Sequence, residues 1–198
     1  MGDVCPSGRL PFTNAVKLED CPAERFGERL VENSKYNDDI FVGYRGHERD
    51  NIPPLFAFGH GLSYASFVYD GLKIEDQGAA PEISFKVANT SVVDGKKIAQ
   101  IYFGLAENDG SRPVKERKGF DKKLVKAGER ERFVIAVQKE NLRVWDKGWK
   151  WIKGEYVVSV GSASDDIRLV GRGSILNQFQ KVNPRGSFYT NHKEEILL

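Results

Sequence analysis

A period-two alternation of apolar and polar residues, repeated in separate runs between residues 65 and 175, constrains the fold of this chain most strongly. Ile83, Phe85 and Val87 alternate with Ser84 and Lys86 in one of these runs. Similar runs, bounded by Gly, Asp or Lys-Gly, lie at residues 99–105, 133–137 and 156–160, and further strands are expected at 67–74, 117–124 and 167–175. Side chains two apart in a strand point to the same face, so each run predicts a strand with one apolar face.

About seven strands of this kind predict two sheets packed face to face, because each strand can bury only one face against a partner. The fold class is therefore mainly β, an immunoglobulin-like or fibronectin type III-like sandwich of antiparallel strands. Asp94-Gly95, between the second and third runs, suits a tight hairpin turn because both residues tolerate positive φ angles. Tyr156, near a strand start, is expected to be a corner tyrosine whose hydroxyl bonds to nearby backbone.

The chain divides into three parts by sequence texture. Residues 1–64 hold frequent Gly, Pro, Asn and Asp, and no period long enough to enclose a core; their clearest helix candidate is 23–32. Residues 65–175 carry the sandwich. Residues 176–198 are polar and aperiodic, which predicts a loosely attached tail.

Composition excludes several classes of protein. With 40% hydrophobic and 29% charged residues, the 198-residue chain is globular rather than disordered. Its 30 basic and 28 acidic residues give a formal charge of +2, too small to indicate nucleic acid or an anionic membrane as a partner. No run approaches the roughly 20 apolar residues of a spanning helix, and the first residues lack the apolar region of a signal peptide. The cellular location stays unassigned on this basis.

Motifs for catalysis, metals and cofactors do not emerge from the residues. His47, His60 and His192 are far apart, without the spacing of a zinc site, and we assign no metal, no cofactor and no catalytic residue. Cys5 and Cys21 are either two ordinary thiols or one local disulfide, and spacing alone leaves both open.

Two binding or modification sites are weighed against structural roles. Trp149 and Trp151 are two apart, so in a strand they share a face and could stack on sugar rings; the alternative is that one or more of them pack into the core. Asn89-Thr90-Ser91 is a glycosylation acceptor pattern, relevant if the chain enters the secretory route.

Several strings resemble a known family. They are SGRLPFT at 7–13, YNDDIFVGYR at 36–45 and PLFAFGHGLSY at 54–64, followed by RPVKE at 112–116, KGF at 118–120, GEY at 154–156 and VGSAS at 160–164. In order and spacing they are similar to the C-terminal end of glycoside hydrolase family 3, the β-glucosidase family. The likeness covers about residues 7–175. It departs at Gly46-His47-Glu48, where family members usually carry aromatic residues and Asp, and at Ala57, where Pro is usual.

The resemblance implies a division of labour. In that family a (β/α)8 barrel supplies a nucleophilic Asp and a following α/β sandwich usually supplies an acid/base Glu, both upstream of the matched strings. Residues 1–64 then correspond to the end and linker of an incomplete α/β sandwich, and 65–175 to the fibronectin type III-like domain. We expect an accessory or structural part of a retaining β-glucosidase, inactive alone, that meets β-glucosides only through its parent enzyme; many family members are extracellular.

Two alternatives from other classes remain at this point. One is a carbohydrate-binding module that grips glucan with Trp149 and Trp151. The other is a protein-interaction module that docks on a separate polypeptide bearing the catalytic barrel.

Overall fold

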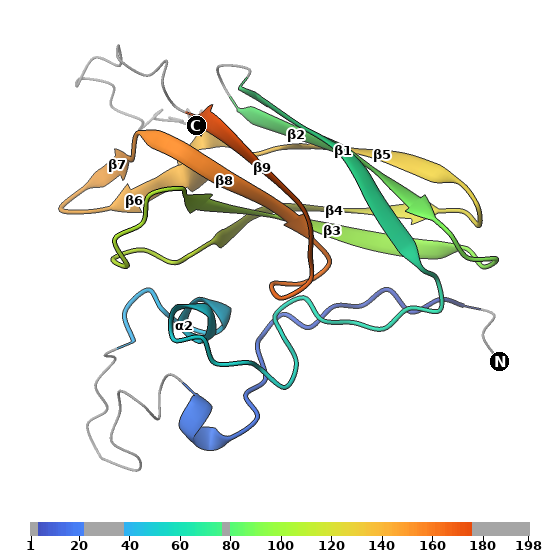
Figure 1. The fold of residues 1–198 in the computed structure, drawn as a ribbon, viewed down its shortest axis with the longest axis horizontal. Helices are drawn as coiled ribbons and strands as arrows, with labels where there is room; N and C mark the ends of the chain where they lie inside the picture. The colour runs from blue at the N-terminus through green and yellow to red at the C-terminus, as the bar shows by residue number, and fades with distance from the viewer. Residues whose placement is uncertain (1–3, 22–37, 77–79, 176–198) are drawn as a thin grey trace, which may run out of the picture.

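Two antiparallel sheets stack face to face to form the body of the molecule (Figure 1). This computed structural model describes residues 4–21, 38–76 and 80–175; the expected helix at 23–32 and the expected tail at 176–198 lie outside them. One sheet has the strand order β1-β2-β5 and the other β4-β3-β8-β9. The strands are β1 (Phe67–Asp76), β2 (Pro81–Asn89), β3 (Gly95–Leu105), β4 (Glu116–Val125), β5 (Arg130–Ala136), β8 (Gly154–Gly161) and β9 (Ile167–Ile175).

The core lies between the two sheets and is built from the alternating apolar residues. Phe85 on β2 stacks on Phe133 of β5 at 5.3 Å and on Tyr69 of β1 at 6.1 Å between ring centroids. Fully burying a side chain of this kind contributes about 1.5–3 kcal/mol. Opposite this stack, the second sheet buries Ala99, Ile101, Phe103, Val158 and Val160. The predicted fold class, a mainly β antiparallel sandwich, is confirmed.

The hairpin expected at Asp94-Gly95 is wrong, because the chain crosses between the sheets at this point. β2 pairs with β1 and β5, whereas β3 pairs with β4 and β8. Asp94 instead accepts a hydrogen bond from the Ala127 amide at 2.8 Å. Gly95 is required by packing, since a Cβ there would lie 2.8 Å from Ala65 Cβ and from Phe67 Cζ.

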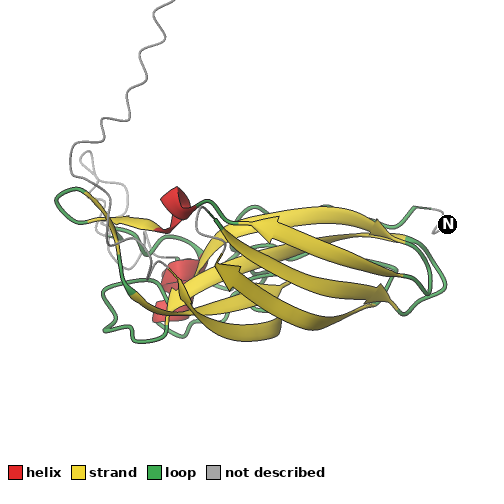
Figure 2. Ribbon diagram, turned by 90° about the horizontal axis from the view of Figure 1, so that it is seen from above, coloured by secondary structure: helices red, strands yellow, loops and turns green. Residues whose placement is uncertain are grey.

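A small hairpin is inserted between β5 and β8. It follows the 3-10 helix η2 (Lys139–Leu142) and consists of β6 (Arg143–Trp145) and β7 (Trp149–Trp151). It projects beyond one end of the sandwich (Figures 1 and 2). At its return to β8, the Tyr156 hydroxyl donates a hydrogen bond to the Ile152 carbonyl at 2.7 Å, and burial raises the pKa of Tyr156 to about 12. The corner tyrosine predicted at this position is confirmed.

The central strand β3 is buried on both faces. Its inward set meets the other sheet, and Gln100 and Tyr102 on the opposite face are 3% and 0% exposed. The described residues between 4 and 64, here called the covering segment, lie against this outer face (Figure 1). The covering segment includes the 3-10 helix η1 (Leu18–Asp20) and the short helix α2 (Tyr44–Arg49).

Backbone hydrogen bonds hold the two ends of the covering segment together. The Leu10 amide donates to the His60 carbonyl at 2.9 Å, and the Asn14 amide donates to the Phe56 carbonyl at 2.8 Å. The Ser164 amide, in the β8–β9 connection, donates to the Phe58 carbonyl at 2.8 Å. The covering segment is thus a third layer that depends on the sandwich for its buried surface.

None of the helices formed by the described residues has the length and apolarity needed to cross a lipid bilayer.

Candidate functional site

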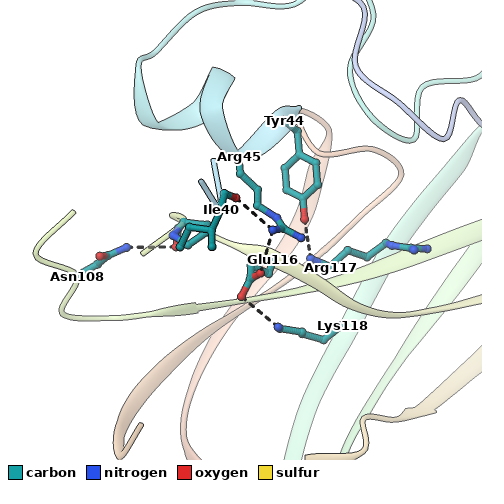
Figure 3. Close-up of polar contacts among 8 residues, drawn as sticks. Ile40, Tyr44, Arg45, Asn108, Glu116, Arg117 and Lys118 are labelled. Atoms are coloured by element: carbon teal, nitrogen blue, oxygen red, sulfur yellow. Dashed lines mark hydrogen bonds and ion pairs between the residues drawn. The ribbon is translucent and has the colours of Figure 1, made fainter. Parts of the chain in front are cut away.

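Tyr44 is the central residue of the contact between α2 and the sandwich. Its ring stacks on Phe58 at 5.1 Å and meets the edge of Tyr102 at 6.0 Å between centroids. Its hydroxyl accepts a hydrogen bond from the Arg117 amide at 2.9 Å, at the start of the edge strand β4 (Figure 3). An aromatic cluster with one polar bond therefore fixes α2 over the outer face of β3 and β4.

A charged network lies beside this aromatic cluster. Arg45 on α2 donates to the Ile40 carbonyl at 3.2 Å and forms an ion pair with Glu116 at 3.6 Å (Figure 3). Glu116 also accepts a hydrogen bond from Lys118 at 3.1 Å. Because these side chains are partly exposed, the network contributes little stability, about 0–1 kcal/mol per pair, but it orients α2 on β4.

A cleft of about 500 Å³ opens between the covering segment and the sandwich. At its wall the Lys115 ammonium donates a hydrogen bond to Glu48 Oε1. The other carboxylate oxygen, Glu48 Oε2, is buried without a hydrogen-bond partner among the described residues, as is Thr13 Oγ1. Burial raises the pKa of Glu48, and the bond to Lys115 acts in the opposite direction. The remaining lining residues are Tyr44, His47, Asn51, Ile52, Pro53, Pro54, Ser164, Asp165 and Ile167.

The charged residues of this cleft come from both the covering segment and the sandwich. Asp165 adds a second carboxylate to the wall, but Glu48 is neutralised by Lys115. The Glu48–Lys115 ion pair joins α2 to the residues that precede β4.

The cleft was not predictable from the sequence. Glu48 and Lys115 are 67 positions apart, and no local pattern joins them. His47, which the histidine spacing left without a metal role, is 4% exposed, and its Nδ1 lies 3.1 Å from the Ile52 carbonyl oxygen. The departure from the family pattern at Gly46-His47-Glu48 was the available signal, since it set this loop apart from the rest of the matched strings.

Two tryptophans lie exposed on the β6–β7 hairpin. Trp145 and Trp149 face each other across the hairpin, with ring centroids 5.5 Å apart and ring planes at 78°. They are 63% and 62% exposed. Asp146 and Lys150 form an exposed ion pair beside them at 2.7 Å. Such a surface is large, aromatic and polar at its border, which is typical of sites that bind another molecule.

Trp151 has a structural contact that Trp149 lacks. It packs against the core, and its Nε1 donates a hydrogen bond to the Lys139 carbonyl at 3.2 Å. The Arg143 guanidinium lies 5.5 Å from the Trp149 ring centroid and 5.9 Å from that of Trp151. Of the two predicted sugar-stacking residues, Trp149 is therefore accessible and Trp151 is mostly committed to packing. The sugar-stacking role stays a prediction.

Trp145 is the residue that the sequence-based site omitted. The structure pairs it with Trp149 through the turn at Lys147-Gly148, where φ is 51° at Lys147 and 148° at Gly148. Positive φ at two consecutive turn residues is typical of a tight hairpin. The Lys-Gly dipeptide between the tryptophans was the signal that could have identified the pair.

Asn89, the predicted glycosylation site, is only 2% exposed. Its amide nitrogen donates hydrogen bonds to the Val93 carbonyl at 2.8 Å and to the Val125 carbonyl at 3.0 Å, and its oxygen accepts one from the Ser91 amide at 3.0 Å. A glycan would replace one of the two hydrogens on this nitrogen, so it would have to break at least one of these bonds. Glycosylation of Asn89 stays a prediction, and in the folded domain the side chain joins the β2–β3 connection to the end of β4.

Replacing Asn89 by alanine is expected to lower the free energy of unfolding by about 1–2 kcal/mol, because the Val93 and Val125 carbonyls lose their buried donor. Urea unfolding followed by far-UV circular dichroism measures this change. Thr90→Ala is the matched control, since Thr90 is exposed and bonds to Ser66 only at 3.3 Å. Equal losses in the two variants would contradict the structural role of Asn89.

Cys5 and Cys21 are both free thiols in this structure. Cys5 Sγ lies 3.1 Å from Ser63 Oγ, so the thiol is part of the contact between the two ends of the covering segment. Of the two alternatives left open above, the structure has the unpaired one.

This chain is similar to known proteins over most of its length. A model of the fibronectin type III-like domain matches residues 97–164. The β-glucosidase BoGH3A of Bacteroides ovatus is 39% identical over 178 residues, covering 84% of this chain and 24% of that protein. The thermostable β-glucosidase B of Acetivibrio thermocellus is 34% identical, covering 85% of this chain and 23% of that protein.

Solved structures give the same result. The β-glucosidase of Kluyveromyces marxianus in complex with glucose matches with a TM-score of 0.82 at 36% identity, over 88% of this chain and 21% of that one. The GH3 β-glucosidase of Bifidobacterium adolescentis matches with a TM-score of 0.81 at 33% identity, over 88% of this chain and 26% of that one. The chain thus spans about a quarter of the length of these relatives.

Proposed function

Because this chain corresponds to the C-terminal part of the glycoside hydrolase family 3 β-glucosidases, we propose that it is an accessory, non-catalytic part of such an enzyme. The reaction of the whole protein would be hydrolysis of terminal β-D-glucosyl bonds. The residues described here would support that reaction by folding onto the catalytic part, and β-glucosides would meet the catalytic part rather than this chain.

The observation that carries the proposal is the extent of the similarity. The match covers 84% of the chain. Residues 65–198 make up a smaller share, 134 of the 198 residues, so the match must continue into the covering segment. The covering segment and the sandwich are also joined by Tyr44, by Arg45 and by the Glu48–Lys115 pair. We therefore propose that residues 1–64 are the end of an α/β sandwich domain and that 65–175 act as its rigid support.

A second observation supports docking on the rest of the enzyme. The covering segment exposes many large apolar side chains, and exposed apolar surface of this kind can mark an interaction site. They are Val4, Phe12, Val16, Leu18, Val42, Leu55, Phe56, Leu62 and Tyr64. We propose that some of this surface packs on the upstream part of the enzyme.

A chimaera tests the docking proposal. The C-terminal part of the Bacteroides ovatus relative that matches this chain is replaced by this chain, and hydrolysis of an aryl β-glucoside is measured. We expect activity to be retained, and to fall about tenfold or more with Leu55→Asp or Leu62→Asp, because a charge would be buried in the contact. Val170→Asp, at a 62% exposed position on β9, is the control. Equal activity in all three variants would contradict docking through the covering segment.

Activity of the purified chain tests the accessory role itself. We expect no hydrolysis of an aryl β-glucoside, because the catalytic Asp and Glu of the family lie upstream of the matched strings. Hydrolysis that is abolished by Glu48→Gln or Asp165→Asn would overturn the proposal, since it would place the reaction in the cleft described above.

The exposed tryptophans favour a second candidate function, binding of glucan by the hairpin. In a pull-down on insoluble cellulose, retention that is abolished by Trp149→Ala would support it. Trp145→Ala tests the partner ring, and Trp151→Ala requires a parallel measurement of folding because Trp151 packs on the core. Unaltered retention in Trp149→Ala would remove this candidate.

A further inference from the structure

A groove of about 230 Å³ lies between the first residues of the covering segment and the outer face of β3 and β4. Leu10 and Phe58 of the covering segment and Phe120 of β4 give it apolar walls. Two arginines, Arg9 and Arg117, also line it, and no carboxylate is among its lining residues. The groove therefore combines apolar walls with two positive charges.

Arg117 is held in a fixed place without an anionic partner. Its guanidinium carbon lies 5.3 Å from the ring centroid of Phe58 and 5.0 Å from that of Phe120. Figure 3 shows its side chain extending away from the Arg45–Glu116 network. No acidic group among residues 4–21, 38–76 and 80–175 lies within 4 Å of this guanidinium. Its five N–H donors are thus oriented but not paired with a carboxylate.

Arg9 is the more buried of the two arginines. Its Nη1 donates a hydrogen bond to the Gly61 carbonyl, while its Nε is buried without an acceptor in the described part of the chain. Burial lowers the pKa of the guanidinium. Asp166, whose charge also acts on Arg9, is already paired with Arg168 at 2.6 Å. Partial burial of a guanidinium without a counter-ion is unfavourable, and an anion in the groove would offset part of that cost.

Gln100 also lines the groove, but its amide is neutral and so provides no counter-ion for the arginines. Gln100 donates to the Ser162 carbonyl at 2.8 Å and accepts from the Tyr102 hydroxyl at 3.2 Å. Each end of its amide therefore already has one partner, and the charged donors in the groove are those of the guanidiniums. Guanidinium groups bind carboxylate and phosphate oxygens in pairs of parallel hydrogen bonds.

We propose that Arg9 and Arg117 form a binding site for the carboxylate or phosphate group of a small molecule, whose carbon part packs on Leu10 and Phe120. At about 30 Å³ for each water in the liquid, the groove has room for seven or eight waters, which suits a small organic acid or phosphate ester. This site is separate from the Glu48–Lys115 cleft and from the tryptophan hairpin, and it does not depend on the proposed function.

Titration of the full chain at low ionic strength, followed by amide chemical shifts, tests the site. The probes are inorganic phosphate and benzoate, with neutral benzamide as the control ligand. We expect saturable shifts of residues around the groove with at least one anion, and no saturation with benzamide. Tighter binding of phosphate or of benzoate identifies the preferred anionic group.

Variants assign the binding to the two arginines. Arg117→Gln is expected to weaken the anion about tenfold, while its backbone bond to Tyr44 is kept. Arg9→Lys keeps the charge but loses the paired donors, so a smaller weakening is expected. Arg172→Gln, at an exposed arginine paired with Glu155 on the other edge of the sheet, is the matched control. Absence of saturation with both anions, equal affinity of Arg117→Gln and the unaltered chain, or benzamide binding as tightly as benzoate would each overturn the proposal.

Discussion

Replacing Tyr102 by alanine is expected to lower the free energy of unfolding by about 3–5 kcal/mol, as for other large aromatic side chains removed from a core. Tyr102 lies on the outer face of β3, yet it is fully buried beneath Tyr44 of the covering segment. The substitution leaves a cavity between the layers and deprives Gln100 of its donor. Urea unfolding measures the loss, and faster proteolysis within residues 4–64 is expected to accompany it.

Phe120→Ala is the matched control for this prediction. Phe120 is an aromatic residue on the neighbouring strand β4, but it is 57% exposed. Its removal should cost less than about 1 kcal/mol, as is usual for exposed positions. If Tyr102→Ala destabilises the chain no more than Phe120→Ala does, the outer face of β3 is not buried in solution and the third layer does not exist as described.

Replacing Lys97 by methionine is expected to raise the free energy of unfolding at pH 7 by about 2–3 kcal/mol. Lys97 is 7% exposed on β3, and within the described ranges no carboxylate lies within 4 Å of its ammonium. Burial lowers the pKa of Lys97 to about 8, and the positive charge of Arg9 acts in the same direction. Methionine fills the same space without a charge, so the penalty for burying the ammonium disappears, and this gain exceeds the loss of the ammonium's contacts with the Phe67 and Tyr69 rings.

The advantage of this variant is expected to depend on pH in a defined window. Below pH 8 the ammonium is charged in both the folded and the unfolded chain, and folding carries the full penalty. Between pH 8 and 10.5 the folded chain loses the proton while the unfolded chain still holds it, so the stability of the unaltered chain rises with pH. The difference between the two proteins should therefore shrink from pH 7 to pH 10.

Unfolding free energies of both proteins at several pH values test this window. Asp166 and Arg168 also act on Lys97, and they are present in both proteins. The tyrosines whose pKa is raised by burial likewise cancel in the comparison. A stability difference that stays constant from pH 7 to pH 10, or a variant that is less stable throughout, would show that Lys97 is not buried as a charge.

The sandwich was predictable because its signal is local. The spacing of two between Ile83, Phe85 and Val87 is enough to predict that they share a buried face. The corner tyrosine Tyr156 likewise bonds to a residue only four positions away. The edge position of β4 also agrees with its basic start, since charge on an edge strand discourages further pairing.

The third layer was not predictable for the opposite reason. Tyr102 and Gln100 fall on the strand face that alternation assigns away from the core, and their burial depends on a segment about 40 or more positions upstream. That segment has no periodicity of its own, so nothing in its residues predicts where it lies. The proximity of Glu48 and Lys115 was not predictable either, nor was the placement of Arg9 and Arg117 in one groove. Each pair comes together only when the layers pack.

The double burial of β3 also determines where this polypeptide can be shortened. A fragment beginning at residue 65 would retain every strand of the sandwich, and the positions of the strands alone would suggest it as a complete domain. It would nevertheless expose the tyrosine and glutamine side chains of an intact sheet to water, next to the apolar surface that α2 and residues 54–60 now shield. We therefore expect such a fragment to self-associate more readily than the chain that keeps the upstream residues.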